Sequence, residues 1–471
     1  MRTVLQPSQQ IVAGNFAGWG EIDIRMKRIN RASIKKTIYY LRRNGIRKTW
    51  AAVRERLDRR GTEEYKWVPT TAEKLLMQSH YAEEQGYTIA FSIVVPAYRT
   101  PGNCLRELME TLLAQSYGKW ELILADASED TSVRDVAAEY TDARIRYIRL
   151  GRNAGIAENT NQALLHVTGD YVGLLDHDDV LTADALFEMA KRIEEGRRDG
   201  REPWMLYSDE DKCNGDMTVF FEPNKKEDFN LDLLLSNNYI CHLLVMRAEL
   251  IQKLGFRKEF DGAQDYDLVL RAAAELMNRE NAIIHIPQVL YHWRCHSGST
   301  AENPASKMYA YHAGGQAVQS FVDNMGWEAQ VVATEHLGFY RLCYGGSPLR
   351  VRDDLGAVGG RLISHGLICG GRMTEEGTVF YEGLPVSYSG YLHRAVLPQD
   401  AQVLDIRNLE VRTSLRELFR EVTGVEYAVI PGTEKFDPAA IPPQEDPVEL
   451  SLRLGRALRE RGFRLLYLPE Y

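Results

Sequence analysis

Short hydrophobic runs alternate with amphipathic stretches from about residue 90 onward. Runs rich in β-branched and aromatic residues have the pattern of strands: FSIVVPAY, WELILADAS, ARIRYIRL and DYVGLLDHDD. Between them, apolar residues recur at helical spacing in LRELMETLLAQ, SVRDVAAEY and IAENTNQALLHV. This alternation predicts an α/β fold with a parallel sheet, in which ligands bind beyond the carboxyl ends of the strands.

The pattern continues beyond this region and divides the chain into parts. Further strand-like and helical runs are WMLYSDE, ICHLLVMRAELIQKLG, QDYDLVLRAAAEL and AIIHIPQVLYHWR. A helix is expected over 306–325, two strands over 328–345, and a last helix before the strand RLLYLPEY. We predict a basic helical segment over 1–89, an α/β domain over 90–325, and a smaller α/β module over 326–471.

Composition is that of a folded, water-exposed protein. Of 471 residues, 44% are hydrophobic and 26% charged, and no apolar run approaches the roughly 18 residues that span a membrane. The N-terminus lacks the pattern of a secretory signal, so a cytoplasmic location is expected. The six cysteines show no zinc or redox spacing and are interpreted as reduced thiols.

Positive charge is concentrated in residues 25–60, which contain fourteen Lys or Arg and two acids. Apolar residues at helical spacing on both sides of Gly45 predict two basic amphipathic helices. Such helices suit an anionic membrane surface, although a solvated helix packed on the next domain is an alternative. No base-reading motif or aromatic platform accompanies them, and the net charge is −9, so nucleic acid is not an expected partner.

The loop after the fourth predicted strand contains Asp176, His177, Asp178 and Asp179. Crowded carboxylates raise one another's pKa unless a cation neutralises them, and Mg2+ and Mn2+ prefer oxygen ligands. We therefore predict a divalent metal site here. An Asx-turn with a helix cap is one alternative. A His-Asp phosphohydrolase is another, but that class places its pair on a helix, whereas this segment is strand-like.

Earlier loops at the same sheet edge offer contacts for a nucleotide. They contain Pro96, Ala97, Tyr98, Asp126, Asn153 and Gly155. Asp126 can accept from a base N–H or a ribose hydroxyl, and Tyr98 can stack on a base. The chain lacks both GxGxxG and GxxxxGK[ST], which argues against a dinucleotide cofactor and a P-loop nucleotide.

Six motifs in this order resemble the family 2 glycosyltransferases with the GT-A fold. They are VVPAY, LADAS, GRNAGIAENTNQAL, LLDHDD, GAQDYDLVLR and YHWRCHSGST, and they cover about residues 90–300. The resemblance implies a Rossmann-like mixed sheet. The last two motifs are most similar to transferases that build rhamnose-rich or O-antigen-type bacterial surface polysaccharides.

The resemblance also implies roles for individual residues. Asp126 would bind the base, and Asp176 would face the ribose. Asp178, with Asp179, would hold Mn2+ or Mg2+ between the donor diphosphate oxygens. Asp265 would be the general base that takes the proton from the attacking acceptor hydroxyl, with inversion at the anomeric carbon.

The last motifs leave some positions open. Where the family usually has Glu-Asp, this chain has Gln264 before Asp265, so an acceptor-binding carboxylate is missing. The family's final motif often supplies a metal-binding His and a cation near the diphosphate. Here the cation would be Arg294, and His296 is favoured over His292 as the ligand.

Two further groups near the predicted cleft have weaker signals. The acids of YSDEDK could contact an acceptor sugar or form a solvated turn. The remaining histidines, His242 among them, are interpreted as core or surface residues.

The resemblance as a whole implies an inverting, metal-dependent transferase. It would move a sugar from a UDP- or dTDP-sugar to a saccharide or polyprenol-linked acceptor, at the inner face of the cell membrane. Residues 326–471 are similar to part of a second transferase module without its DxD, and are expected to be non-catalytic. The alternative is a non-catalytic nucleotide-sugar-binding scaffold, and the sequence leaves a homo-oligomer open.

Overall fold

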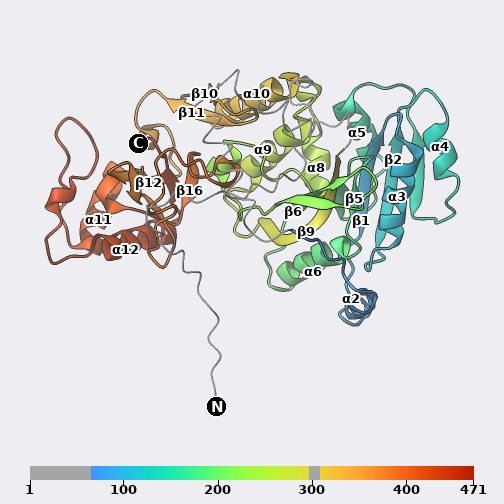
Figure 1. Ribbon diagram of the computed structural model, residues 1–471, viewed down its shortest axis with the longest axis horizontal. Helices are drawn as coiled ribbons and strands as arrows, with labels where there is room; N and C mark the ends of the chain where they lie inside the picture. Colours follow the sequence, from blue (N-terminus) through green and yellow to red (C-terminus); the bar gives the residue numbers. More distant parts are fainter. Residues whose placement is uncertain (1–64, 296–307) are drawn as a thin grey trace, which may run out of the picture.

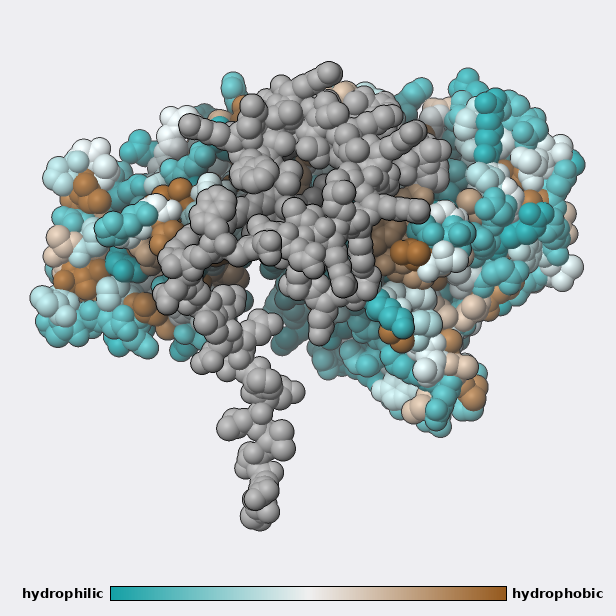
Figure 2. Space-filling view, viewed as in Figure 1, coloured by the Kyte–Doolittle hydropathy of each residue, from teal (hydrophilic) through white to brown (hydrophobic). Residues whose placement is uncertain are grey.

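The computed structural model describes residues 65–295 and 308–471 (Figure 1). The predicted basic helices over 25–60, and His296, lie outside these ranges. Within them, no helix is both long and apolar enough to cross a membrane. The surface seen in Figure 2 is mostly hydrophilic at both ends, with hydrophobic residues scattered over it.

A nine-stranded mixed sheet forms the centre of the larger part, in the order β3-β2-β1-β4-β8-β6-β9-β5, with β7 beside β6. Its strands are β1 (Phe91–Ala97), β2 (Trp120–Asp126), β3 (Ile145–Arg149), β4 (Tyr171–Leu174), β5 (Val180–Leu181), β6 (Met205–Asn214), β7 (Phe220–Asn224), β8 (Leu244–Arg247) and β9 (Ile283–Cys295). The first four strands are parallel, as predicted. β8 is antiparallel to β4 and β6, so the sheet is mixed.

Helices cover both faces of this sheet (Figure 1). The helices of this part of the chain are α2 (Ala72–Glu84), α3 (Gly102–Leu113), α4 (Ser132–Ala137), α5 (Ile156–Leu164), α6 (Ala185–Arg198), α7 (Leu231–Leu234), α8 (Ala248–Leu254), α9 (Gln264–Leu276) and α10 (Met308–Asn324). Successive strand residues enter opposite cores: Ile93 packs with α3 and α6, whereas Val94 packs with α5 and α9. The β-branched runs read from the sequence are therefore strands buried on both faces.

The C-terminal part has a smaller sheet of its own, ordered β16-β19-β12-β18. Its elements are β10 (Ala329–Ala333), β11 (Tyr340–Tyr344), β12 (Leu355–Gly359), β13 (Leu362–Ser364), β14 (Leu367–Gly370), β15 (Arg372–Met373), β16 (Gln399–Ala401), β17 (Val403–Leu404), β18 (Leu409–Val411), β19 (Arg464–Tyr467), α11 (Arg416–Thr423) and α12 (Pro447–Glu460). α11 and α12 pack on this sheet around a separate core.

Contacts cross the sequence-based boundaries at 89/90 and 325/326, which stay predictions. Tyr87 and Ile89 lie in the same core as β1. Tyr340, on β11, lies in the core that contains α9 and α10.

A buried ionic network joins the C-terminal module to α7. Arg352 is fully buried, and its Nη1 donates to Asp232 Oδ1 at 2.5 Å. Asp400, on β16, accepts from the backbone N–H of Leu231 at 2.7 Å and also pairs with Arg464. The first turn of α7 is thus held by side chains more than a hundred residues away in the sequence.

Removing the guanidinium of Arg352 should destabilise the protein strongly. Arg352→Ala leaves Asp232 buried beside Asp400 without its cation, and should lower the free energy of unfolding by about 3–5 kcal/mol. Urea denaturation of the full chain measures this. Arg350→Ala, at a side chain that is 73% exposed, is the matched control and should change the value by less than about 0.5 kcal/mol. Equal effects of the two substitutions would contradict the interpretation.

Candidate active site

The acidic loop lies between β4 and β5, and one of its carboxylates is used inside the protein. Asp179 is fully buried; its Oδ2 accepts from the Tyr291 hydroxyl at 2.5 Å and its Oδ1 from the Arg294 backbone N–H at 2.8 Å. Burial, together with Asp176 and Asp178, raises the pKa of Asp179 well above its usual value. Asp179 therefore fastens the loop to β9, while the side chains of Asp176 and Asp178 remain partly exposed.

Arg294 also holds the acidic loop in place. Its side chain is 1% exposed; Nε donates to the main-chain carbonyl of Asp178 at 2.7 Å, and Nη1 lies 2.6 Å from Glu107 Oε2. A further donation reaches the carbonyl of Gly215 at 2.7 Å. The guanidinium is thus occupied by protein groups and positions the loop. Contact between Arg294 and a diphosphate stays a prediction.

The loops after β1 and β2 lie at the same sheet edge. Asp126 is fully buried and accepts from Tyr147, Arg149 and the backbone of Ser128, each at 2.8 Å. At the end of β1, beyond Pro96 and Ala97, the Tyr98 hydroxyl donates to Glu129 at 3.2 Å. Asp126 is therefore held by its own loop and by two side chains of β3.

A direct contact joins this region to the acidic loop. Thr100 Oγ1 lies 3.0 Å from His177 Nδ1, so the loop after β1 and the loop after β4 are adjacent, as the sequence predicts.

The turn before α5 has a backbone that requires glycine. Gly155 has φ of 99°, and a Cβ there would lie 2.5 Å from Asp261 Oδ2. The Asn153 side chain accepts from the Gly155 N–H at 3.1 Å and from Asn159 at 2.9 Å. Asn153 is exposed, so its amide group is accessible beside the turn.

Asp265 lies in the first turn of α9, and its Oδ2 accepts from Asn238 Nδ2 at 2.9 Å. Burial raises its pKa; His242 opposes this shift, whereas Asp176 adds to it. A carboxyl group with a raised pKa is suited to accept a proton near neutral pH. Gln264 accepts from the Gly262 N–H at 2.8 Å, so its carbonyl oxygen is used at the start of the helix. Asp267 pairs with Arg257 and Arg271 and is structural.

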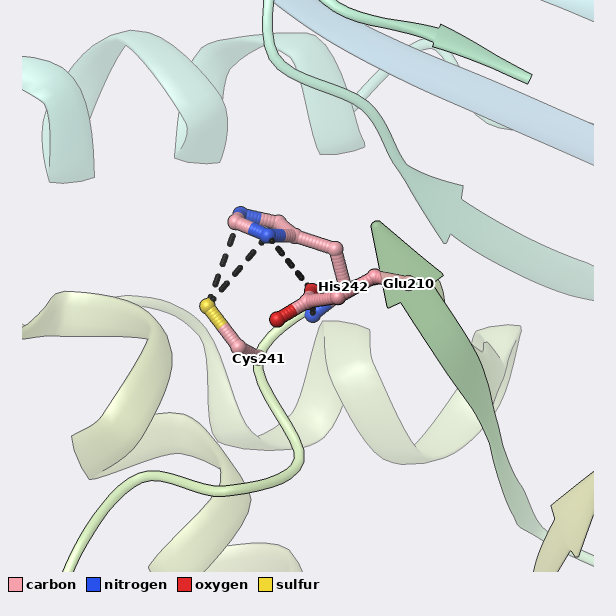
Figure 3. Close-up of side chains that lie close together, drawn as sticks. All are labelled: Glu210, Cys241 and His242. Carbon is pink, nitrogen blue, oxygen red and sulfur yellow. Dashed lines mark hydrogen bonds and ion pairs between the residues drawn. The ribbon is translucent and has the colours of Figure 1, made fainter. Parts of the chain in front are cut away.

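His242 was expected to be a core or surface residue, but it lies in this site. Its Nε2 is 3.7 Å from Asp176 Oδ2, and its Nδ1 is 3.2 Å from Glu210 Oε2. Figure 3 shows its ring beside Glu210 and Cys241. One ligand atom from each of these three residues lies within 4.8 Å of the others, so they form a group that could hold a metal.

The solvated-turn interpretation of YSDEDK is wrong, because these residues form part of β6. Asp209, Glu210 and Asp211 are all buried. The many charged residues of this run do not suggest a buried strand. In the structure each acid is paired with a histidine: Asp209 with His285, Glu210 with His242 and Asp211 with His292.

His292 lies on the opposite face of the sheet from the acidic loop. In the β6–β9 register, Glu210 pairs with Tyr291 and Asp211 with His292, and successive residues of a strand alternate faces. Tyr291 faces Asp179; His292 Nδ1 instead lies 2.5 Å from Asp211 Oδ1, and Trp67 packs edge-on against its ring. This geometry disfavours His292 as a metal ligand. His296, the preferred candidate, lies outside the described residues.

Residues 92–255 match the family model "Glycosyl transferase family 2". This segment is similar to the family 2 glycosyltransferases, and the sheet to which it contributes is mixed, as the sequence predicts. An uncharacterized protein y4gI of Sinorhizobium fredii is 40% identical over 232 residues, 48% of this chain and 25% of that protein. The O-antigen biosynthesis protein RfbC of Myxococcus xanthus is 32% identical over 260 residues, 54% of this chain and 19% of that protein. The chain thus spans a quarter or less of these two relatives.

Solved structures show weaker similarity. S. aureus TarS 1-349 in complex with UDP-GlcNAc is 19% identical, with a TM-score of 0.40 over 50% of this chain and 67% of that one. The mannosyltransferase PcManGT from Pyrobaculum calidifontis, in complex with GDP-Man and Mn2+, is 17% identical, with a TM-score of 0.38 over 61% of this chain and 75% of that one.

The different surroundings of Asp178 and Asp179 predict different effects of the same substitution. Asp179→Asn presents an NH2 group to one of two buried donors, and should lower the free energy of unfolding by about 1–3 kcal/mol. Asp178→Asn, in a partly exposed position, should change it by less than about 0.5 kcal/mol. Urea denaturation of both variants at pH 7 makes the comparison. Equal losses would contradict a buried structural role for Asp179.

Proposed function

We propose that the protein is an inverting, metal-dependent glycosyltransferase. It moves a sugar from a UDP- or dTDP-sugar to a saccharide acceptor. The observation that carries the proposal is the convergence of Asp265 with the acidic loop: one loop carries both Asn238, which donates to Asp265, and His242, which lies 3.7 Å from Asp176. A proton acceptor and a nucleotide-facing acid therefore belong to one site.

In the proposed reaction, the acceptor hydroxyl oxygen attacks the anomeric carbon as the bond to the nucleotide diphosphate breaks. Asp265 takes the hydroxyl proton in the same step, and no covalent enzyme intermediate forms. Asn238 orients the Asp265 carboxyl by its hydrogen bond. Gln264 supplies no carboxylate at the neighbouring position, so the acceptor must find its other contacts elsewhere.

The donor set of the acidic loop fits a hard divalent cation, Mn2+ or Mg2+. Asp178 offers a partly exposed carboxylate, and Asp176 on the same loop is also partly exposed. Carboxylate oxygen is the ligand that such ions prefer. Asp178 would hold the ion with His296, while Asp176 faces the ribose and Asp179 keeps the loop in place. When bound, the ion offsets negative charge on the departing diphosphate.

The nucleotide would lie along the loops after β1, β2 and β3. Asp126 would receive the base, with Tyr98 beside it. The main-chain groups of Pro96, Ala97 and Gly155 would line the pocket with Asn153. Arg294 would act on the diphosphate side through the loop that it holds.

The proposed pathway is synthesis of a bacterial cell-surface polysaccharide. RfbC is named for O-antigen biosynthesis, and a further relative is named as a transferase acting on a diphosphoundecaprenol-linked sugar. A polyprenol-linked acceptor would place the protein at the inner face of the membrane, with residues 25–60 in contact with anionic lipid. The C-terminal module would be non-catalytic, and a homo-oligomer remains compatible with the proposal.

Nucleotide binding tests the site directly. Calorimetry of the native chain with UDP, dTDP, GDP and CDP should show binding of one pyrimidine diphosphate, and only with Mn2+ present. Asp178→Ala should lose that binding, because the ion loses its main ligand. Binding of no nucleotide under any condition would contradict the proposal.

Turnover tests the base and separates an enzyme from a scaffold that only binds nucleotide sugars. Asp265→Asn should lower nucleotide release from a UDP- or dTDP-sugar by on the order of 10²-fold or more, because the proton acceptor is gone. Its nucleotide affinity should be unchanged. Glu275→Gln, at an exposed position on the same helix, is the control and should keep full activity. Full activity of Asp265→Asn would refute the assignment of the base, and absence of turnover in the native chain would favour the scaffold.

A further inference from the structure

The loop between α7 and β8 brings two side chains to the site. Asn238 donates to Asp265 at 2.9 Å, and four residues later His242 Nε2 lies 3.7 Å from Asp176 Oδ2. The Cys241 N–H points back to Asn238 Oδ1 at 3.4 Å, which closes the loop on itself. The proposed base and the proposed ribose-facing acid are therefore served by one short segment.

Contacts on its other sides fix the imidazole of His242. Its ring stacks on Tyr291, with centroids 4.6 Å apart and planes 9° from parallel. Nδ1 lies 3.2 Å from Glu210 Oε2, as drawn in Figure 3. The same Glu210 oxygen lies 3.4 Å from the ammonium of Lys226, which also donates to the carbonyl of His242. The ring has little freedom to turn.

The charges in this cluster favour an imidazolium. Burial acts to raise the pKa of Glu210, but Lys226 and His242 outweigh it and lower the pKa to about 2. Glu210 is therefore ionised throughout the neutral range. Burial lowers the pKa of His242, but its neighbours Cys241 and Glu210 raise it well above the usual value. Because burial raises the pKa of the Cys241 thiol, Glu210 is the neighbour that carries the charge.

We propose that His242 is a positioning residue for the reaction: its imidazolium, held by Glu210, offsets the repulsion between the carboxylates of Asp176 and Asp265. This inference rests on the function proposed above. Two carboxylates in one site disfavour each other's ionised form, and a cation beside them reverses that effect. The charge of His242 thus keeps Asp265 ready to accept a proton at neutral pH.

Titratable groups face His242 from every side of the cluster. They are Cys241 on its own loop, Glu210 on β6, Asp176 and Asp179 on the acidic loop, Tyr291 on β9 and Asp265 on α9. Within residues 65–295 and 308–471, Glu210 is the one of these acids that has a Lys or Arg group, Lys226, within 4 Å. His242 is consequently the charged donor that faces Asp176 from this loop.

A metal ion held by Glu210, Cys241 and His242 is the competing interpretation. The ammonium of Lys226 already lies 3.4 Å from the Glu210 oxygen that would bind it, so a second cation would be repelled. The Cys241 sulfur lies 3.3 Å from Nδ1 and 3.6 Å from Nε2 of the His242 ring. It is thus at a similar distance from both nitrogens, whereas a metal shared with Cys241 would be bound by the lone pair of one nitrogen. The geometry favours a charged imidazole over a metal ligand.

The charge of His242 can be measured without turnover. In the full chain labelled with 13C at histidine Cε1, the signal that His242→Gln removes should report a protonated ring at pH 7.5. Glu210→Gln should shift its titration to lower pH, because the stabilising carboxylate is gone. A neutral His242 ring at pH 7 would overturn the proposal.

The consequence for the base appears in the pH profile. Release of UDP or dTDP from UDP-glucose, UDP-N-acetylglucosamine and dTDP-rhamnose is followed between pH 5 and 9. His242→Gln should raise the acid limb of kcat/KM by about one pH unit, because Asp265 loses a nearby cation. Turnover should fall by at most roughly 10-fold at the acidic end of this range and approach the native value at pH 9. The double variant with Glu210→Gln should shift no further.

His285 is the matched control, since it also pairs with an acid of β6 and stacks on a tyrosine. Its Nε2 lies 2.8 Å from Asp209, and its ring centroid is 5.0 Å from that of Tyr207. His285→Gln should leave the acid limb unchanged, which separates an electrostatic role from lost packing. An unmoved acid limb in His242→Gln would overturn the proposal. A bound zinc ion would also overturn it. That result would be Zn2+ that stays bound after desalting in the native chain and in Asp178→Ala, and is lost in Cys241→Ser.

The two proposals fail in different ways. If the native chain releases no nucleotide from any donor, the proposed function fails. The 13C titration of His242 then still decides whether its ring is charged. If the native chain turns over and His242→Gln has the native pH profile, the proposed function stands and the role of His242 is refuted.

Discussion

The active-site loop depends on one buried carboxylate. Asp179 is buried away from water and accepts hydrogen bonds from the Tyr291 hydroxyl and the Arg294 backbone N–H, both on β9. This pair of hydrogen bonds ties the loop after β4 to β9, which lies three strands further along the sheet. Because Asp179 is fixed, its neighbours Asp176 and Asp178 point from a rigid turn instead of a mobile loop. Arg294 reinforces the turn through the Asp178 carbonyl.

Such a turn concentrates negative charge, and the structure answers it from two sides. Beneath the loop, Arg294 contributes a buried cation that is balanced by Glu107. Beside it, the order Lys226, Glu210, His242, Asp176 alternates positive and negative groups. Alternation lets several ionisable groups be buried together, since each has an opposite charge at short range. The site is thus a charge-balanced cluster and not an isolated acidic patch.

The sequence was informative where a local pattern decides the structure. The apolar runs of β1 and β2, and the helical spacing of α9, lead directly to buried elements. Asp126 and Asp265 follow, because Asp126 ends β2 and Asp265 lies in the first turn of α9. It was uninformative where burial is made possible by a distant partner. Glu210 and Asp211 look like turn residues until strand β9 supplies His292 and the α7–β8 loop supplies His242. YSDEDK contains no period-two alternation of apolar and polar residues, so this run alone does not predict a strand.

The contact between α7 and the C-terminal module joins the two halves of the molecule at a sensitive point. α7 immediately precedes the loop that bears Asn238 and His242, and the N–H of its first residue, Leu231, is accepted by Asp400 of the module. Asp232 on the same turn is neutralised by Arg352. The module therefore adds a second side-chain acceptor to a helix N-terminus that Asn230 already caps. A chain shortened to its first 345 residues would keep every residue assigned to the chemistry. It would lose the contacts of Arg352 and Asp400 with α7, and these support the loop that contacts Asp265 and Asp176.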